Sequence, residues 1–249
     1  MKIDDWEVLI LALDTSSAGG SAAVIRADGQ HTVHFEIAGD GTRSHAERLP
    51  TELMAVLTEA GATIEDVDRL AVVIGPGSFT GLRVGIATIQ GLALARGLPV
   101  TPVSSFEALA WQARSETSAD PIAAWVEAHR GEVFATLLAS DARTVLAPAT
   151  ALPAEATLDA WRETLAPFAR VRFIGDGAVR YREVIRARLG GQAQVDETSP
   201  ILAAACGRIA AGDLPRAVRP HALVPLYIRR PDVELSRDRR AAAARSTPG

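Results

Sequence analysis

Cysteine and lysine are almost absent from this chain of 249 residues. Cys206 is the only cysteine, which excludes an internal disulfide and any metal cluster built on cysteines, and fits a reducing compartment. Lys2 is the only lysine among 26 lysine and arginine residues, and we interpret this as a bias of genome composition because the positive charges are scattered. The formal net charge of −4 gives no general attraction to nucleic acid, so any contact with RNA has to be local.

Long hydrophobic runs are missing as well. No window of about 18 residues is apolar throughout, and the segment from Met1 to Trp6 carries charges instead of an apolar leader region. We therefore expect neither a signal peptide nor a membrane span, and a cytoplasmic protein. With 48% hydrophobic and 22% charged residues, the composition is typical of a soluble globular protein of one large or two small domains.

The most informative stretch is the glycine-rich segment from Gly75 to Arg83. It follows an apolar run over 70–74 that has the length of a buried strand, and it precedes a helical pattern over 82–96, so it is predicted to be a strand-to-helix turn. Glycine permits the tight backbone of such a turn, and the free N–H groups at the start of a helix attract anions. The spacing matches neither common nucleotide-binding fingerprint, which leaves two interpretations open: a tight packing turn and an anion site.

Small residues gather on one side of the predicted helix 82–96. Glycine inside a helix costs about 1 kcal/mol relative to alanine, so we expect this side to meet another helix, in the same chain or in a partner. Arg83 opposes the helix dipole in the first turn, and two roles are open for it: an ion pair with a partner subunit, or an internal ion pair with Glu47 or Glu52. The small residues are Gly81, Gly85, Thr88, Gly91 and Ala95.

The first half of the chain follows a β-β-β-α-β-α-β-α order. Short apolar runs predict strands over 8–13, 21–26 and 31–37, separated by turn signals, as in an antiparallel meander. A capping box at Ser44 begins a helix that Gly61 ends. After the glycine-rich turn and its helix, the pattern predicts a strand over 98–103 and a helix over 105–114.

The second half partly repeats this order after a boundary at Asp120-Pro121. The pattern is interrupted by a proline- and alanine-rich stretch over 147–156 and by a turn at Gly175-Asp176-Gly177. The arginine-rich end after Arg229 is not expected to be packed on the rest of the chain. The predicted strands are 122–127, 133–138, 144–146 and 171–174, and the predicted helices are 158–165, 181–189 and 201–211.

Three antiparallel strands followed by alternating helices and strands, present twice, are the layout of the α/β actin-like (ASKHA) and ribonuclease-H-like folds. We therefore predict two tandem domains of βββαβα type. The first is expected over 1–118 and carries the pairing helices, the second is expected over 119–229, and an arginine-rich tail is expected over 230–249.

Several segments resemble, in order, those of the TsaB family, also called YeaZ, across about residues 8–229. The specific part is the eleven-residue glycine motif from Gly75 to Gly85. At one position the chain has Glu127-Ala128-His129 where the family commonly has Asp-Ala-Arg. The other matching segments are Leu13 to Ser16, Ser44 to Pro50, Val103 to Phe106, Ala128 to Phe134 and Pro225 to Arg229.

This resemblance implies a companion subunit of the threonylcarbamoyl transferase TsaD, without activity of its own. In the family, that complex, with the ATPase TsaE, forms N6-threonylcarbamoyladenosine beside the anticodon of tRNA, so ATP and metal are expected on the partner subunits and none in this one. The resemblance also implies pairing through two helices of the first domain, with TsaD or, in the chain alone, as a homodimer. The expected pairing residues are Leu49, Leu53, Val56, Leu57, Arg83, Gly85, Ile86 and Ile89.

The rival hypothesis is an actin-like ATP-binding protein or ATPase. Asp14 stands where actin-like ATPases place a magnesium-linked aspartate, although Asp and Ser side chains also hold ordinary hairpin turns. No histidines or acids have metal-ligand spacing, no nucleophile elbow supports a peptidase, and Cys206 is expected in the core. The candidate nucleotide or anion residues are Asp14, Thr15, Ser16, Gly75, Gly77, Ser78, Thr80 and Gly81.

Overall fold

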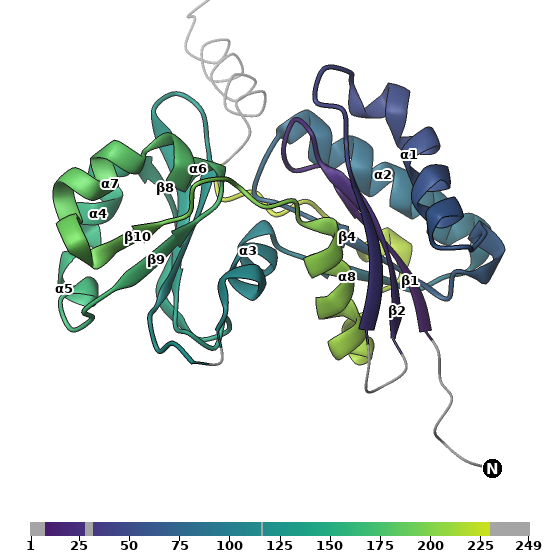
Figure 1. Ribbon diagram of the computed structural model, residues 1–249. Helices are drawn as coiled ribbons and strands as arrows, with labels where there is room; N and C mark the ends of the chain where they lie inside the picture. The colour runs from purple at the N-terminus through teal and green to yellow at the C-terminus, as the bar shows by residue number, and fades with distance from the viewer. Residues whose placement is uncertain (1–7, 28–31, 116, 230–249) are drawn as a thin grey trace, which may run out of the picture.

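The structure is a computed structural model that describes residues 8–27, 32–115 and 117–229. Figure 1 shows two lobes side by side, each built on one mixed sheet. The predicted tail 230–249 lies outside the described residues. No helix in the described ranges is long and apolar enough to cross a membrane.

The first sheet has the strand order β3-β2-β1-β4-β5. The central strand β1 pairs antiparallel with β2, and β2 pairs with β3, which confirms the predicted meander; β1 and β4 are parallel, as are β4 and β5. The strands are β1 (Val8–Asp14), β2 (Ser21–Ala27), β3 (Thr32–Ala38), β4 (Arg69–Val73) and β5 (Val100–Val103).

Three helices of the first lobe begin and end where local chemistry dictates. A capping box joins Ser44 and Glu47 at the start of α1 (His45–Glu59), with Ser44 N donating to the Glu47 carboxylate over 3.0 Å. Gly97, with φ of 67°, ends α2 (Phe79–Arg96) in the left-handed conformation that glycine adopts easily. A second capping box begins α3 (Ser105–Ala113).

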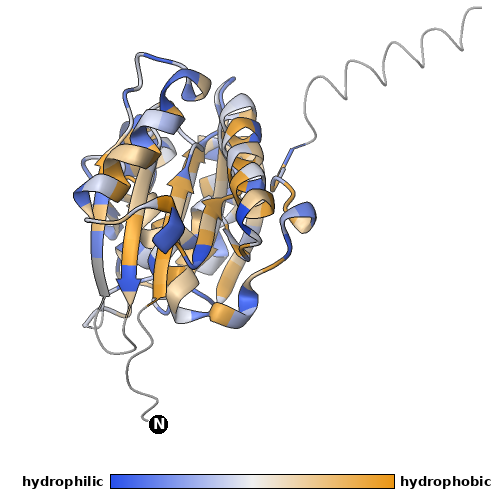
Figure 2. Ribbon diagram, turned by 90° about the vertical axis from the view of Figure 1, so that its right-hand side faces the viewer, coloured by the Kyte–Doolittle hydropathy of each residue, from blue (hydrophilic) through white to orange (hydrophobic). Residues whose placement is uncertain are grey.

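Alternation along β1 covers both faces of the first sheet. Leu9, Leu11 and Leu13 point into a core with α1 and α2, whereas Ile10 and Ala12 point into a second core with α3 and α8. A strand buried on both faces reads as a continuous apolar run, which is how this strand appears in the sequence. In Figure 2 the central strands are mostly hydrophobic, and the helices alternate between hydrophobic and hydrophilic positions.

The second sheet repeats the topology of the first. Its order, β10-β9-β6-β7-β8, places β6 at the centre. On one side β6 pairs antiparallel with β7 and β7 with β8, and on the other side β6 pairs parallel with β9 and β9 with β10. The strands are β6 (Ile122–Glu127), β7 (Glu132–Leu138), β8 (Val145–Pro153), β9 (Val171–Ile174) and β10 (Ala193–Val195). The helices are α4 (Ala154–Ala160), α5 (Arg162–Leu165), α6 (Asp176–Arg180) and α7 (Arg182–Leu189), followed by α8 (Ala203–Gly212).

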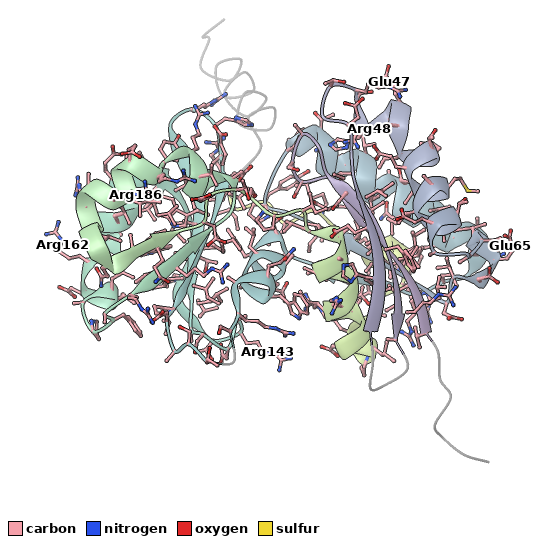
Figure 3. The ribbon with its side chains drawn as sticks, in the orientation of Figure 1. Glu47, Arg48, Glu65, Arg143, Arg162 and Arg186 are labelled. Carbon is pink, nitrogen blue, oxygen red and sulfur yellow. The ribbon has the colours of Figure 1, made fainter. Side chains whose placement is uncertain are left out.

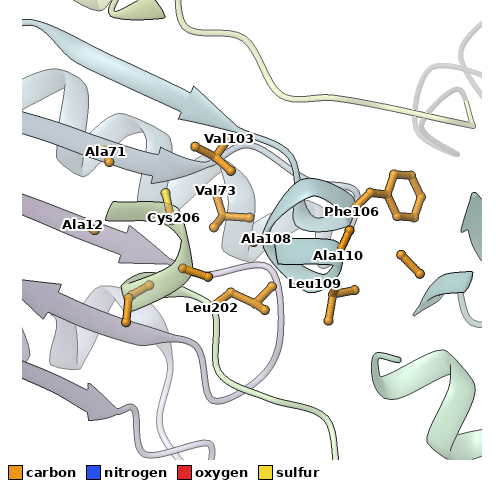
Figure 4. Close-up of a cluster of buried hydrophobic side chains, with 14 of the residues drawn as sticks. Ala12, Ala71, Val73, Val103, Phe106, Ala108, Leu109, Ala110, Leu202 and Cys206 are labelled. Carbon is orange, nitrogen blue, oxygen red and sulfur yellow. The ribbon is translucent and has the colours of Figure 1, made fainter. Parts of the chain in front are cut away.

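One apolar core joins the two lobes. Phe106 and Leu109 of α3 share a cluster with Ala124 of the second sheet, with Val73 of the first sheet and with Cys206 of α8 (Figure 4). Cys206 is fully buried there, which confirms its predicted place in the core. The lobes are therefore packed on a common layer of helices.

The C-terminal part of the described chain returns to the first lobe. Helix α8 packs on β1 and β2, and Val218 bridges to Val100 at the edge of the first sheet. Arg216 binds the Glu107 carboxylate through both of its terminal nitrogens, at 2.7 and 2.9 Å. The expected second domain over 119–229 is thus too long: its last part covers the first sheet, because the apolar residues of α8 bury themselves there.

Two local expectations also change. The strand predicted over 144–146 extends as β8 to Pro153, so most of the proline- and alanine-rich stretch is an edge strand, and the helix after it begins at Ala154 rather than near 158. Proline is tolerated in an edge strand because its missing N–H does not remove a hydrogen bond from the interior of the sheet. The turn at Gly175 opens directly into α6.

Candidate functional site

The glycine-rich turn joins β4 to α2, as predicted. Ser78 caps the helix through its hydroxyl, which accepts a hydrogen bond from Gly81 N over 3.2 Å, and Thr80 lies exposed in the first turn. Two bonds from Ser105 anchor the turn to α3: its N–H donates to Gly75 O over 2.8 Å and its hydroxyl to Pro76 O over 2.7 Å. The turn is thereby fixed on both sides.

Three glycines of the motif lie against the loop that follows β1. A Cβ on Gly77 would stand 2.4 Å from Ser16 O, one on Gly81 would stand 2.2 Å from Thr15 O, and one on Gly85 would stand 2.1 Å from Thr15 Oγ1. Ser78 N, at the start of the helix, donates to Ser16 O over 2.7 Å. The chain itself therefore occupies the space in front of the turn, and the glycines serve close packing.

Asp14 ends β1 inside this packing. Its side chain is 2% exposed, and its Oδ1 accepts a hydrogen bond from Ser16 N over 2.8 Å, which is the geometry of a hairpin turn held by aspartate. Burial raises the pKa of Asp14, and the charges of Glu36 and Asp176 add to this rise. In the part of the chain that the structure describes, no group of three or more His, Cys, Asp or Glu side chains is arranged to hold a metal ion.

The turn at Gly175 in the second lobe has the same construction. A Cβ on Gly175 would stand 2.2 Å from Trp125 O, at the end of β6. Asp176 accepts hydrogen bonds from Glu127 N at 2.9 Å and from Gly177 N at 2.8 Å, so its carboxylate ties this turn to the strand.

A buried arginine holds the loop after β1 from the opposite side, and the sequence analysis missed it. Arg48 of α1 is 2% exposed; it binds Glu52 at 2.6 Å and donates to the carbonyl oxygens of Ala18 and Gly19. Figure 3 shows Arg48 beside the tip of the hairpin. The available signal was the spacing of Arg48 and Glu52, which suits an ion pair on one helix face.

His45 joins the same network. Its Nε2 lies 3.0 Å from Ser17 O, and its Nδ1 lies 2.6 Å from a terminal nitrogen of Arg48. Because the carbonyl only accepts and the guanidinium only donates, the neutral Nε2–H tautomer satisfies both contacts. Burial, and then the charge of Arg48, lower the pKa of His45.

Most of the expected pairing residues lie inside the chain's own core. Leu49, Leu53, Val56 and Leu57 of α1 and Ile86 and Ile89 of α2 are buried against the first sheet, and Gly85 faces Thr15. The pairing prediction is therefore wrong at these seven positions. The helical spacing of the apolar residues marked the faces that the chain's own sheet covers, so these side chains are not available to a partner.

Arg83 uses neither of its two expected acids. Its Nε donates to the Tyr227 hydroxyl over 3.1 Å, and its guanidinium lies 3.9 Å from the centre of the Phe79 ring. The internal ion pair with Glu47 or Glu52 is wrong, because Glu47 binds Ser44 and Glu52 binds Arg48. Arg83 is exposed, so an ion pair with a partner stays a prediction.

The outer faces of α1 and α2 form a separate surface, which we call the outer helix face. It carries two large exposed apolar side chains, Met54 with 56% and Leu94 with 70% of the side chain accessible. Small residues of α2 are exposed as well: Ala87 is exposed, and a Cβ on Gly91 would meet nothing within 4 Å. The small-residue side of α2 is thus divided, with Gly81 and Gly85 inward and Gly91 and Ala95 outward.

Two sheets of identical topology, packed on a common layer of helices, define a two-lobed α/β protein of the actin-like class. A family model described as TsaD, tRNA N6-adenosine threonylcarbamoyltransferase, matches residues 36–171, more than half of the chain. A solved structure of a Pseudomonas aeruginosa protein, described as similar to the peptidase YeaZ, superposes with a TM-score of 0.70 at 28% identity, over 89% of this chain and all of that one.

Two relatives place the chain more closely. An uncharacterized protein of Mycobacterium tuberculosis strain H37Rv is 32% identical over 90% of this chain and 93% of its own length. The tRNA threonylcarbamoyladenosine biosynthesis protein TsaB of Escherichia coli is 38% identical over 50% of this chain and 52% of its own, so that match spans about half the length of each protein. The chain belongs to the TsaB (YeaZ) family.

We expect Gly85→Ala to lower the free energy of unfolding by about 1–3 kcal/mol, because the new methyl group would overlap Thr15 Oγ1. In the Thr15→Ala background the same change should be much less destabilising, because the overlapping atoms are gone. Urea denaturation of the four proteins measures this coupling. The control is Gly91→Ala, which enters open space and should stabilise helix α2 by up to about 1 kcal/mol. Additive effects of Gly85→Ala and Thr15→Ala would contradict the packing role.

His45 should make stability depend on pH. Its pKa in the folded chain lies below the ordinary value of 6.5, so the unfolded chain binds more protons as the pH falls through that value. The contribution of His45 to stability is therefore complete above about pH 6.5 and is lost on acidification. Urea denaturation between about pH 5 and 7.5 should show a smaller loss in His45→Gln than in the wild type, whereas His221→Gln, at an exposed position, should follow the wild type.

Proposed function

We propose that this chain acts in the biosynthesis of threonylcarbamoyladenosine in tRNA, as a non-catalytic subunit that pairs with a TsaD-like transferase. Membership of the TsaB family supports the pathway, because the E. coli relative is named for it. The observation that carries the role of pairing subunit is the outer helix face. It carries two large exposed apolar side chains and small residues, and it covers the side of the first lobe where α1 and α2 lie next to each other (Figure 1).

The chemistry of the outer helix face suits helix-to-helix pairing. Met54 and Leu94 are large apolar groups whose burial is favourable, and the flat positions at Ala87 and Gly91 let a second helix come close. The same face serves a homodimer when the chain is alone and a heterodimer when the transferase is present. Met54 and Leu94 replace the buried residues of the sequence-based expectation as the pairing residues.

The catalytic groups are assigned to the other subunits under this proposal. The packing of Gly77, Gly81 and Gly85 against the loop after β1 supports this division, because the chain's own atoms fill the space beside these glycines. We expect ATP and metal on the TsaD-like and TsaE-like subunits, tRNA to bind through the complex, and the complex to work in the cytoplasm. Peptidase activity is not expected.

Gly91→Arg should abolish pairing and leave the fold intact. The new side chain points into open space in the single chain, but it would place a charged group inside a close helix pair. Size exclusion with light scattering, on the protein alone and mixed with the TsaD of the same organism, measures the effect.

The matched control is Gly191→Arg, an exposed glycine of the second lobe whose Cβ also meets nothing within 4 Å. The control should pair like the wild type, and thermal denaturation should show both variants folded. Dimers and mixed complexes that persist in Gly91→Arg would reject the outer helix face as the pairing surface.

Isothermal calorimetry with Mg²⁺-ATP tests the rival function. We expect no binding heat for the wild type, since Asp14 is buried and already accepts Ser16 N. Binding in the micromolar range that Asp14→Ala removes would establish a nucleotide site and overturn the non-catalytic role.

A further inference from the structure

Two arginine side chains lie against the indole ring of Trp111, at the seam between the two lobes. The guanidinium carbon of Arg114 lies 4.1 Å from the centre of the Trp111 ring, and that of Arg208 lies 5.6 Å from it. Trp111 belongs to α3 and packs on the core that joins the lobes, whereas Arg208 comes from α8. Two positive charges, one from the residue that follows α3 and one from α8, thus lie against one partly buried indole.

These two arginines differ from Arg172 and Arg216 in what they bind. Arg172 binds Asp196 and Arg216 binds Glu107, but in the described ranges neither Arg114 nor Arg208 has a carboxylate within ion-pair distance. Arg208 donates instead to His34 Nδ1 over 2.6 Å, a contact that requires a neutral imidazole.

The charge of Arg208 acts on two neighbouring groups, His34 and Glu36. Partial burial, and then the charge of Arg208, lower the pKa of His34. The Glu36 carboxylate lies in the same region, but it accepts Ala204 N over 2.8 Å, and burial raises its pKa. In a chain of net charge −4, Arg114 and Arg208 therefore form a local cationic site.

The stacked geometry selects among anionic partners. One face of the Arg114 guanidinium lies on the indole, and because Arg114 is exposed, its other face is open to solvent. Unpaired nucleobases stack on arginine planes and on aromatic rings, and phosphates bind guanidinium groups. An acidic protein segment would satisfy the charge but would leave the stacking face unused.

We propose that Trp111, Arg114 and Arg208 bind an unpaired nucleotide of RNA, with the base on Arg114 and the phosphate on Arg208. The choice of RNA rests on the proposed function in tRNA modification. The site lies on the face of the first sheet that α3 and α8 cover, opposite to α1 and α2, so RNA and a protein partner do not compete for one surface.

The test measures binding of an unmodified tRNA transcript to the full chain by fluorescence anisotropy, alone and with the TsaD of the same organism. Arg114→Gln with Arg208→Gln should weaken binding at least about tenfold and reduce the slope of log Kd against log salt concentration by about one to two. Arg114→Lys keeps the charge but not the planar stack, so it should weaken binding several-fold at an unchanged slope.

The matched control is Arg162→Gln with Arg186→Gln, which removes two charges from the outer side of the second lobe (Figure 3) and should bind like the wild type. Wild-type affinity in the Arg114 and Arg208 double variant, or no binding by the wild type, would overturn the proposal. Equal binding of a fully paired RNA duplex would also overturn it, since a duplex offers no base for the stack.

Light scattering on the same samples separates this inference from the proposed function. Arg114 and Arg208 lie away from the outer helix face, so the double variant should still pair with TsaD. Pairing without any RNA difference would reject the nucleotide site alone, whereas failure of the wild type to pair would reject the pairing role.

Discussion

The close approach of α2 to the loop after β1 is the contact on which the first lobe depends. Backbone lies against backbone at Gly77 and Gly81, and at Gly85 the helix meets a buried threonine side chain, so no side chain larger than hydrogen fits at these three positions. The same loop is held from the other side by Arg48 and His45 of α1. The loop thus sets both helices side by side, and their outward residues form the outer helix face.

A second constraint comes from the layer shared by the lobes. Helix α3 contacts the cores of both sheets, and α8 returns from the end of the described chain to close the inner face of the first sheet. Close packing of this kind resists rearrangement, so the lobes are joined by a core rather than by a flexible linker. The arrangement separates two surfaces: the outer helix face on one side of the first sheet, and the Trp111 site at the seam on the other.

Most sequence-based predictions of strands and helices agree with the structure because each depends on local chemistry; the exceptions are β8, the start of α4, and β10, which was not predicted. The meander, the capping box at Ser44 and the strand before Gly75 are all read from neighbouring residues. The pairing residues failed for a related reason. Periodic apolar residues such as Leu49 and Ile89 identify a buried face, but whether that face is covered by the chain itself or by a partner depends on segments far away in the sequence.

The sequence by itself determined the order of elements, the repeat, the glycine motif and the family, because periodicity, turn chemistry and motif spacing act over short distances. Tertiary structure decided which neighbour each element meets. It showed that Gly85 packs on Thr15 whereas Gly91 faces solvent, that α8 belongs to the first sheet, and that Arg114 and Arg208 meet on one tryptophan. These contacts join residues far apart in the sequence, 182 positions in the case of Ala203 and Ser21, and the packing of the whole chain brings them together.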